Sequence, residues 1–507
     1  LSNNTTLNVN NGSNQQQQIA GNLTIDAGSK FSMGGLTNST ISVGVVVIGN
    51  VKVIGQLLFD STTERLSCAS FTNASGAVTT LSTKLGGDLE IIGNLSDSGT
   101  FNANSRAVFF SGNAVQEIIG SGTTFNIDYI VMNKSAGSVR LLNNLLCEGP
   151  NGANAISFTS SSDTLDLNGF RLTLGKTGIS SFISGNGIIK GSATSNITIL
   201  GIGNIGSLSF DQSSDGITNR LNSLTLNRTL SGNFSLATNL KVNSLILTDG
   251  IINIGNNQLS LTGNSISRSS GLLDADSAII SFENTANVNL PANLFLGNVL
   301  AIKLNTVGNR IITLNSDITL TGFINFATGL MNIATYNFIF GVNATVTGTP
   351  STSSMFIASG TGQIQRLWNN AGSFLYPIGD ATGTTEYTPL TISITSGIFS
   401  NASISVNVTD AKHPNNVSTT NFLSRYWTIL PIGINNGLAS ISGGYNATSI
   451  ADISGTASLI RSAYLTGSFN QLSNPWIKSG LSPSSGTISF TGVSLTSGQP
   501  SVFTGIT

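Results

Sequence analysis

This sequence of 507 residues has few charged side chains, two cysteines and a single histidine. Charged residues make up 8% of the chain, whereas globular proteins usually carry about 25%. The net charge is −1 and no basic stripe is present, which argues against nucleic-acid binding, because neutralising phosphates needs clustered cations. Cys68 and Cys147 are too few for a disulfide framework, so we expect two buried free thiols. The polar surface must then consist of Asn, Ser, Thr and Gly.

The sequence also has little that could form a membrane-spanning helix. Its most apolar run, "ISVGVVVIGNVKVIGQLLF" (41–59), is interrupted by three glycines and Lys52 and is rich in β-branched residues. A span needs about 20 predominantly apolar residues in a helix, so we interpret this run as stacked buried strands. The chain starts at Leu1 with no visible leader, which we interpret as a removed leader or a fragment.

What the sequence does contain is a repeated phrase. Two aliphatic positions are followed by a turn and then by a second alternating apolar pair. The three copies are "TLDLNGFRLTLG" (164–175), "IINIGNNQLSLTG" (251–263) and "LMNIATYNFIFG" (330–341). A second phrase places Asn133, Asn227 and Asn305 directly after an apolar-x-apolar pair. Phrases that return with their internal spacing intact indicate one structural unit used repeatedly.

Residues 1–345 are therefore predicted to form a parallel β-solenoid with degenerate repeats. Inward Leu, Ile, Val and Phe should stack in apolar columns, while outward Asn, Ser and Thr should form ladders between coils. Stacked like charges would repel, which explains the low charge content. The Asn-Gly pairs should be corners between faces. Because Asn-Gly also marks hairpins, an antiparallel sandwich array is the alternative.

The amino-acid composition changes near residue 345. All three tryptophans, the histidine and most prolines lie beyond it. Segments 388–395 and 402–409 alternate cleanly and are separated by turn residues, a pattern typical of antiparallel strands. We predict an all-β chain with a domain boundary at about 345 and an antiparallel β-sandwich-like domain over 346–507.

Two phrases of the second half are distinctive, "SFLYPIGDATGTTEYTPLTISI" (373–394) and "SRYWTI" (424–429), and an upstream phrase is "LILTDGIINIGNNQLSLTG" (245–263). Together they resemble segments of large secreted and cell-surface β-solenoid proteins of the Bacteroidota, of the adhesin or gliding-associated type exported by type IX secretion, and the resemblance covers most of the chain. The resemblance implies an extracellular or surface location. The matching residues are Tyr376, Pro377, Ile378, Gly379, Asp380, Tyr387, Pro389, Arg425, Tyr426 and Trp427.

Candidate chemical groups are sparse. Asp163 and Asp166 should face opposite sides of a strand, whereas Asp274 and Asp276, at i and i+2, share a face and form the best carboxylate pair of the solenoid. His413 lies beside a proline in a turn-like stretch and is expected to be a surface loop residue.

Asp380 is interpreted as a turn residue, because its loop lacks the acid density of calcium loops. The tryptophans, Trp368, Trp427 and Trp476, are expected in a core, with a sugar-stacking platform as the alternative. We therefore predict no catalytic, metal-binding or cofactor-binding residues, no cofactor, and a protein that is not an enzyme.

These observations predict an extracellular structural or adhesive protein: a subunit of a surface fibre, sheath or layer, or the stalk of an adhesin. A carbohydrate-binding or carbohydrate-active β-helix is the alternative. Expected partners are copies of itself, other surface proteins or surface polysaccharide, and residues 1–20 either add a strand to a neighbour or cap their own solenoid. Three Asp-Ser/Thr-x sites resemble the O-glycosylation motif of the same phylum, at Ser61, Thr164 and Ser277.

Overall fold

The computed structural model describes residues 1–10, 15–37, 42–446, 452–484 and 486–507. These residues form strands almost throughout, with one short 3₁₀ helix, η1 (Ala457–Leu459). None of the helical structure in these ranges is long and apolar enough to cross a membrane. The chain divides into two compact units, 1–259 with 267–273, and 260–266 with 274–507. Each unit is described by itself.

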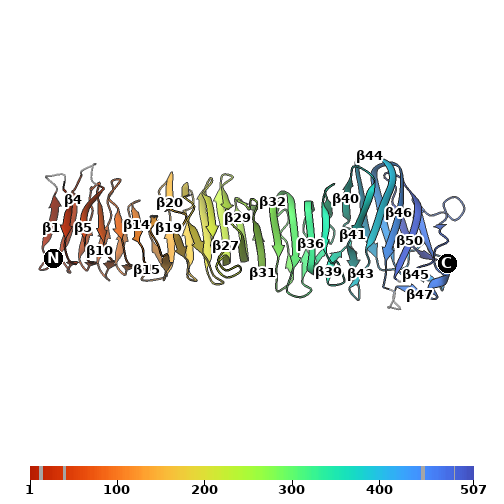
Figure 1. Ribbon diagram of the computed structural model, residues 1–507, viewed down its shortest axis with the longest axis horizontal. Helices are drawn as coiled ribbons and strands as arrows, with labels where there is room; N and C mark the ends of the chain where they lie inside the picture. The colour runs from red at the N-terminus through yellow and green to blue at the C-terminus, as the bar shows by residue number, and fades with distance from the viewer. Residues whose placement is uncertain (11–14, 38–41, 447–451, 485) are drawn as a thin grey trace. The chain divides into compact units, whose positions relative to one another are not determined.

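The first unit is a parallel β-solenoid, as predicted. Thr6 aligns with Lys30, Lys30 with Gln56, Gln56 with Val78, and Val78 with Thr100, so one coil takes 22–26 residues. Figure 1 shows these strands following one another in chain order. Because neighbouring parallel strands pair through backbone hydrogen bonds, each coil is stabilised by the coils before and after it.

Three sheets make up the faces of the early coils. The first contains β1 (Thr6–Asn10), β4 (Lys30–Gly35), β7 (Gln56–Leu58), β10 (Val78–Thr80) and β13 (Thr100–Asn102). The second contains β2 (Gln17–Ile19), β5 (Val43–Val47), β8 (Arg65–Cys68), β11 (Leu89–Ile91), β14 (Ala107–Gly112), β17 (Tyr129–Lys134), β20 (Ala153–Phe158) and β23 (Ser181–Ser184). The third begins with β3 (Leu23–Ile25), β6 (Val51–Val53), β9 (Phe71–Asn73), β12 (Leu95–Asp97), β15 (Gln116–Gly120), β18 (Val139–Leu141), β21 (Thr164–Asp166) and β24 (Ile188–Lys190).

Later coils of the first unit keep the same parallel arrangement, and β25, β27 and β29 are longer than the early strands. One run contains β16 (Thr124–Asn126), β19 (Asn144–Cys147), β22 (Arg171–Leu174), β25 (Asn196–Ile202), β27 (Arg220–Thr229) and β29 (Leu240–Asp249). The run that continues from β24 contains β26 (Gly206–Phe210), β28 (Asn233–Leu236) and β30 (Ile251–Asn253). The division between the units falls within β31 (Gln258–Arg268) and β32 (Leu272–Phe282).

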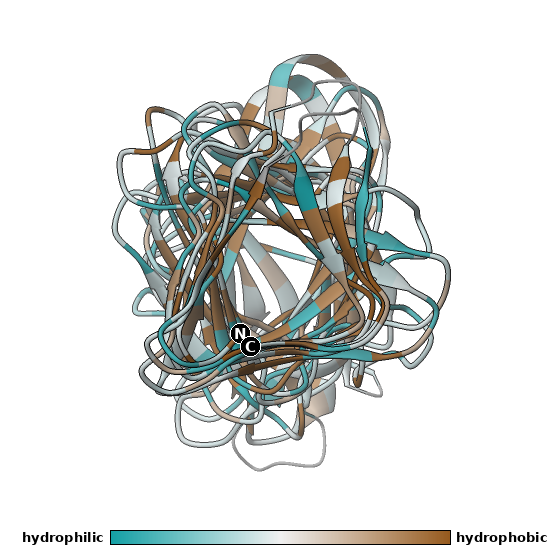
Figure 2. Ribbon diagram, turned by 90° about the vertical axis from the view of Figure 1, so that its left-hand side faces the viewer, coloured by the Kyte–Doolittle hydropathy of each residue, from teal (hydrophilic) through white to brown (hydrophobic). Residues whose placement is uncertain are grey.

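The repeated phrase forms the apolar core, as predicted. Figure 2 shows apolar and polar residues alternating along many strands. Asn168 and Gly169 take positive φ values of 48° and 89° at the corner between β21 and β22, a conformation that Asn and Gly tolerate best. All twelve apolar positions of the three copies are buried: Leu165, Leu167, Leu172, Leu174, Ile252, Ile254, Leu259, Leu261, Met331, Ile333, Phe338 and Phe340.

Outward asparagines link neighbouring coils in two ways. Asn196, Asn222 and Asn243 form a short amide ladder, with Nδ2 to Oδ1 distances of 3.0 and 3.4 Å, so the predicted ladders are present here. More often an Asn side-chain oxygen accepts a backbone N–H of the next coil at the start of its strand. Such oxygens belong to Asn22, Asn94, Asn144, Asn239, Asn287 and Asn337. These bonds satisfy backbone donors at the corners.

Some of the few charges also stack, with alternating sign. Glu117, Arg140, Asp166 and Lys190 occupy one register position on four successive coils. Asp166 lies 3.5 Å from Arg140 and 3.3 Å from Lys190. Opposite charges directly across neighbouring strands attract and like charges repel. A solenoid of this kind therefore tolerates charge where its sign alternates.

The second unit combines parallel and antiparallel strands. Parallel pairing joins β33 (Val288–Asn289), β34 (Phe295–Asn305), β35 (Ile311–Thr313), β36 (Ile318–Asn332), β37 (Phe338–Phe340), β38 (Thr345–Gly348), β39 (Ser354–Ile357), β40 (Ile364–Trp368) and β42 (Ile378–Asp380). From β40 and β42 onward the pairing is antiparallel: β40 pairs with β44 and β42 with β43. The strands of this antiparallel part are β41 (Gly372–Tyr376), β43 (Glu386–Tyr387), β44 (Leu390–Thr409), β46 (Tyr426–Gly444), β48 (Arg461–Thr466), β49 (Ile477–Lys478), β50 (Thr487–Leu495) and β51 (Ser501–Ile506). A separate antiparallel pair joins β45 (Phe422–Leu423) and β47 (Ile453–Ser454).

The antiparallel C-terminal strands confirm the predicted change of architecture. Parallel pairing continues as far as Ile357 with Gly379, beyond the change of amino-acid composition near residue 345. The predicted domain limits stay a prediction. Cys68 and Cys147 are buried free thiols, as predicted. Burial raises the pKa of both.

The first two strands pair with the next coil of their own solenoid, β1 with β4 and β2 with β5. Strand addition to a neighbouring copy stays a prediction. The stretch 11–14 lies outside the described residues.

Candidate functional site

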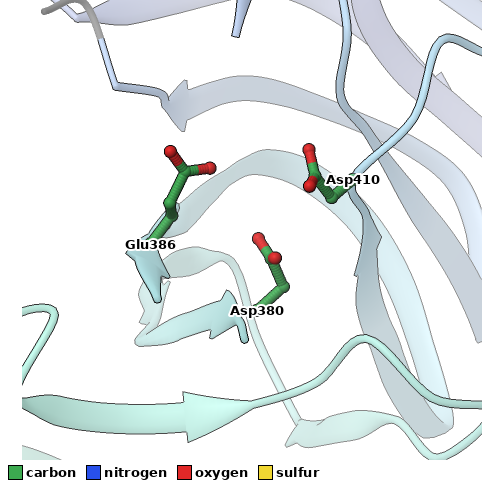
Figure 3. Close-up of side chains that lie close together, drawn as sticks. All are labelled: Asp380, Glu386 and Asp410. Carbon is green, nitrogen blue, oxygen red and sulfur yellow. The ribbon is translucent and has the colours of Figure 1, made fainter. Parts of the chain in front are cut away.

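A buried arginine surrounded by four carboxylates is the most concentrated group of charges in the second unit. Arg425 lies between β45 and β46 and is fully buried. Asp380 ends β42, Glu386 begins β43 and Asp410 follows β44. Figure 3 shows these three acids converging on one space. Asp452, just before β47, is the fourth acid.

The guanidinium contacts all four acids. Its Nη1 lies 3.0 Å from Asp380 Oδ2, and its Nη2 lies 3.1 Å from Asp410 Oδ1 and 3.0 Å from Asp452 Oδ1. Nη2 also pairs with Glu386 Oε2. Further donors hold the outer oxygens: the Thr382 N–H reaches Asp380 Oδ1 at 3.0 Å and the Asn446 N–H reaches Asp452 Oδ2 at 2.6 Å. The cluster therefore ties the segments around β42, β43, β44, β46 and β47 together.

One guanidinium does not balance four carboxylates, and this imbalance affects their protonation. Burial raises the pKa of Asp380 from its ordinary 3.8 to about 6, against the opposing charge of Arg425. Burial also raises the pKa of Asp452. Desolvation disfavours the charged form of a carboxyl group, and nearby carboxylates add to that effect. Asp380 and Asp452 thus take up protons more readily than free carboxyl groups do.

The same acids have a spacing that a cation could bridge, but Arg425 already contacts them. One oxygen each of Asp380, Glu386 and Asp410 lies within 4.8 Å of the others, a separation compatible with calcium at 2.3–2.6 Å per ligand. The Arg425 guanidinium pairs with these three carboxylates. Because it supplies the positive charge that a metal would supply, the residues do not fit a metal centre, and we assign the cluster a structural role.

A pH dependence of stability follows from Asp380. Since its folded pKa lies above its unfolded value, the folded state binds the proton more tightly, and stability should fall as pH rises from about 4 to about 6. Asp380→Asn should flatten this fall. Thermal unfolding followed by tryptophan fluorescence measures it, because all three tryptophans lie in the second unit.

The variant itself supplies the control for other titrating groups. Burial lowers the pKa of His413, an effect of opposite slope that wild type and Asp380→Asn share. Equal slopes for the two proteins between pH 4 and pH 6 would contradict the assignment to Asp380.

The other predicted acids have separate surroundings. Asp163 is buried and accepts N–H groups of Lys134, Thr159 and Ser160 at 2.8–2.9 Å, whereas Asp166 belongs to the charge ladder. Asp274 and Asp276 alternate with the buried Leu273 and Ala275 along β32 and so share its outward face, as expected.

The single histidine and the tryptophans pack against other rings. His413 is half-buried, with ring centroids 4.8 Å from Tyr426 and 5.3 Å from Trp476, rather than a free surface residue. Trp368 and Trp427 are buried, which confirms the core assignment for these two. Trp476 is half-buried and donates to the Asn415 carbonyl at 3.0 Å.

The candidate glycosylation sites differ in exposure. Ser61 and Ser277 are exposed, while Thr164 is half-buried within β21 and donates to the Ser162 carbonyl at 3.3 Å. Modification at these three positions stays a prediction, and exposure favours Ser61 and Ser277.

Asp380 is the last residue of β42 and accepts the Thr382 N–H at the start of the following loop. Sequence reasoning missed the Arg425 cluster to which its other oxygen belongs. The phrases containing Asp380 and Arg425 were the available signal, because both are among the residues that carry the resemblance. Spacing alone did not indicate that they meet.

Comparisons with known proteins identify no relative. No protein-family model matches the chain, and no curated protein or solved structure matches it.

Proposed function

We propose that this chain is a structural or adhesive protein of the cell exterior, either a repeated subunit of a surface fibre, sheath or layer or the stalk of an adhesin. The observation that carries the proposal is the stack of coils held together by apolar columns and by uncharged amide contacts between coils. Each coil buries its apolar face only against its neighbours, so coils add along one direction and the stack presents a repetitive surface.

The described titratable groups support a non-enzymatic role. Arg425 pairs with its acids in a buried cluster, so these groups contact one another. The pair Asp274 and Asp276 lies on an outward strand face, and Asp163 accepts backbone N–H groups. General acid–base catalysis needs groups that can reach a substrate proton. A carbohydrate-active role is therefore less well supported than a structural one.

The resemblance to Bacteroidota surface proteins supports a secreted location and modification at Ser61, Thr164 or Ser277. A glycan would add solubility to a surface short of charge. An intact mass equal to that of the bare polypeptide would exclude such modification.

Self-association is the expected behaviour of a subunit. A net charge of −1 provides little repulsion between copies. Sedimentation velocity of the purified protein over a range of concentrations should therefore show assembled species that grow with concentration. A single monomer at every concentration would contradict the subunit role and leave the stalk role.

A further inference from the structure

Two adjoining hollows on the second unit form a groove across one sheet. Their volumes are about 370 and 330 Å³, and both are lined by Val342 and Leu367. Trp368, Asn369, Phe399, Asn401 and Ala402 line the larger hollow. Asn298, Thr319, Thr321, Gly341 and Asn343 line the smaller one. Each volume lies within the range of about 300–1,000 Å³ typical of small-ligand sites.

Strand register makes the groove continuous. Val299 aligns with Leu320, Leu320 with Phe340, Phe340 with Arg366, and Trp368 with Ala402. The lining residues lie at or beside these positions, on or just after β34, β36, β37, β40 and β44, so the groove runs across successive strands. β36 is paired on both sides, and β40 is paired with β44 along its whole length and with β37 over residues 364–366. Their backbone groups are thus engaged, and a ligand would be held by side chains rather than by strand addition.

The polar lining of the groove is uncharged and available. Within the described residues, the side-chain amides of Asn298, Asn343, Asn369 and Asn401 make no hydrogen bond, and none of the lining residues carries a charge. This differs from the corner asparagines, whose amides accept N–H groups of the next coil. An amide offers both donors and acceptors, the combination that matches hydroxyl groups.

A bulge presents two of the lining residues. The register between β44 and β46 shifts between Phe399 and Ser403, and Asn401 has a φ of 46°. β-Bulges redirect side chains and are enriched next to binding sites. Phe399 is half-buried and contributes an aromatic ring to the lining of the larger hollow.

Arg366 fixes the turn shared by the two hollows. Its guanidinium donates to the carbonyls of Gly341, Val342 and Ala344 and packs over the Phe374 ring, 4.9 Å from the centroid. The turn that carries Val342 and Asn343 is therefore held before any ligand arrives, which reduces the ordering cost of binding.

We propose that this groove binds a neutral oligosaccharide. Neutrality of the ligand follows from the uncharged lining, because an ionic ligand would lose hydration without gaining a counter-charge. Its hydroxyl groups match the four free amides, and the apolar face of a sugar ring matches Phe399 and Leu367. The inference rests on the proposed adhesive function, because it names the class of ligand that an adhesive protein would bind through this groove.

The test uses the whole chain and a panel of neutral hexasaccharides, namely maltohexaose, cellohexaose, mannohexaose, xylohexaose and chitohexaose, with oligogalacturonate as the acidic probe. Isothermal titration calorimetry should detect at least one neutral probe with a Kd below about 1 mM. Phe399→Ala should weaken that binding about tenfold or more, since it removes the aromatic surface. Asn369→Ala should weaken it severalfold.

Asn370→Ala is the matched control, because Asn370 is the exposed neighbour of Asn369 and does not line the groove; its affinity should equal that of wild type. Thermal unfolding followed by tryptophan fluorescence verifies that each variant is folded: its transition should match that of wild type. A Kd above 1 mM for every neutral probe, preference for oligogalacturonate, or binding unchanged by both Phe399→Ala and Asn369→Ala would overturn the proposal. Oligosaccharide binding and self-association are measured by separate experiments. A negative binding result would therefore not affect the sedimentation result, and a monomer in sedimentation would not affect the binding result.

Discussion

Replacing Arg425 with Met should destabilise the second unit by about 3–5 kcal/mol, the usual cost of breaking a buried ion pair from one side. The substitution removes the only guanidinium in contact with Asp380, Glu386, Asp410 and Asp452 within the described chain. The acids would remain as uncompensated charges, and Asp380 and Asp452 are fully buried. Urea unfolding followed by tryptophan fluorescence measures the loss, because Trp427 is only two residues away.

The matched control is Arg310→Met, which removes an exposed arginine in the same unit. A surface substitution of this kind should change stability by no more than about 0.5 kcal/mol. The loss for Arg425→Met should also shrink at low pH, where the carboxyl groups are protonated. Equal stability of the two variants at neutral pH would contradict the account of the cluster.

Phe338→Ala should destabilise the same unit by about 3–5 kcal/mol, since it creates a cavity in a column that cannot collapse fully. Phe338 is fully buried, with its ring centroid 5.2 Å from Phe340 and 4.7 Å from Phe356. Its register partners on the neighbouring coils, Ile318 and Ile364, continue the apolar column. Urea unfolding by tryptophan fluorescence again provides the measurement.

Ile339→Ala is the matched control for this column. Ile339 is the next residue of β37 and is only half-buried, so its truncation should cost clearly less than that of Phe338. A larger loss for Ile339→Ala than for Phe338→Ala would mean that the predicted inward and outward faces are exchanged.

The core of the solenoid was predictable from the sequence because it depends on local periodicity. The spacing of Leu172 and Leu174 assigns one face of a strand, and Asn168-Gly169 marks the corner through its tolerance of positive φ. Stacking then follows, since a short strand with one apolar face needs a neighbour that has the same pattern.

The Arg425 cluster could not be predicted in the same way, because its members meet only after five separated segments have folded together. The Gly/Thr composition of the segment after Asp380 indicated a loop, yet Asp380 ends β42 and its Oδ2 lies 3.0 Å from an arginine 45 positions later in the chain. The groove raises the same difficulty. Asn298 and Asn401 line the same groove because strand register brings their strands together. A short window of sequence contains no information on that register.

Electron microscopy of the source cells, with antibody labelling against this chain, tests the central claim most directly. The account predicts label on intact, unpermeabilised cells, along fibres, a sheath or a surface layer. Label confined to the interior, and seen only after permeabilisation, would contradict an extracellular structural or adhesive role.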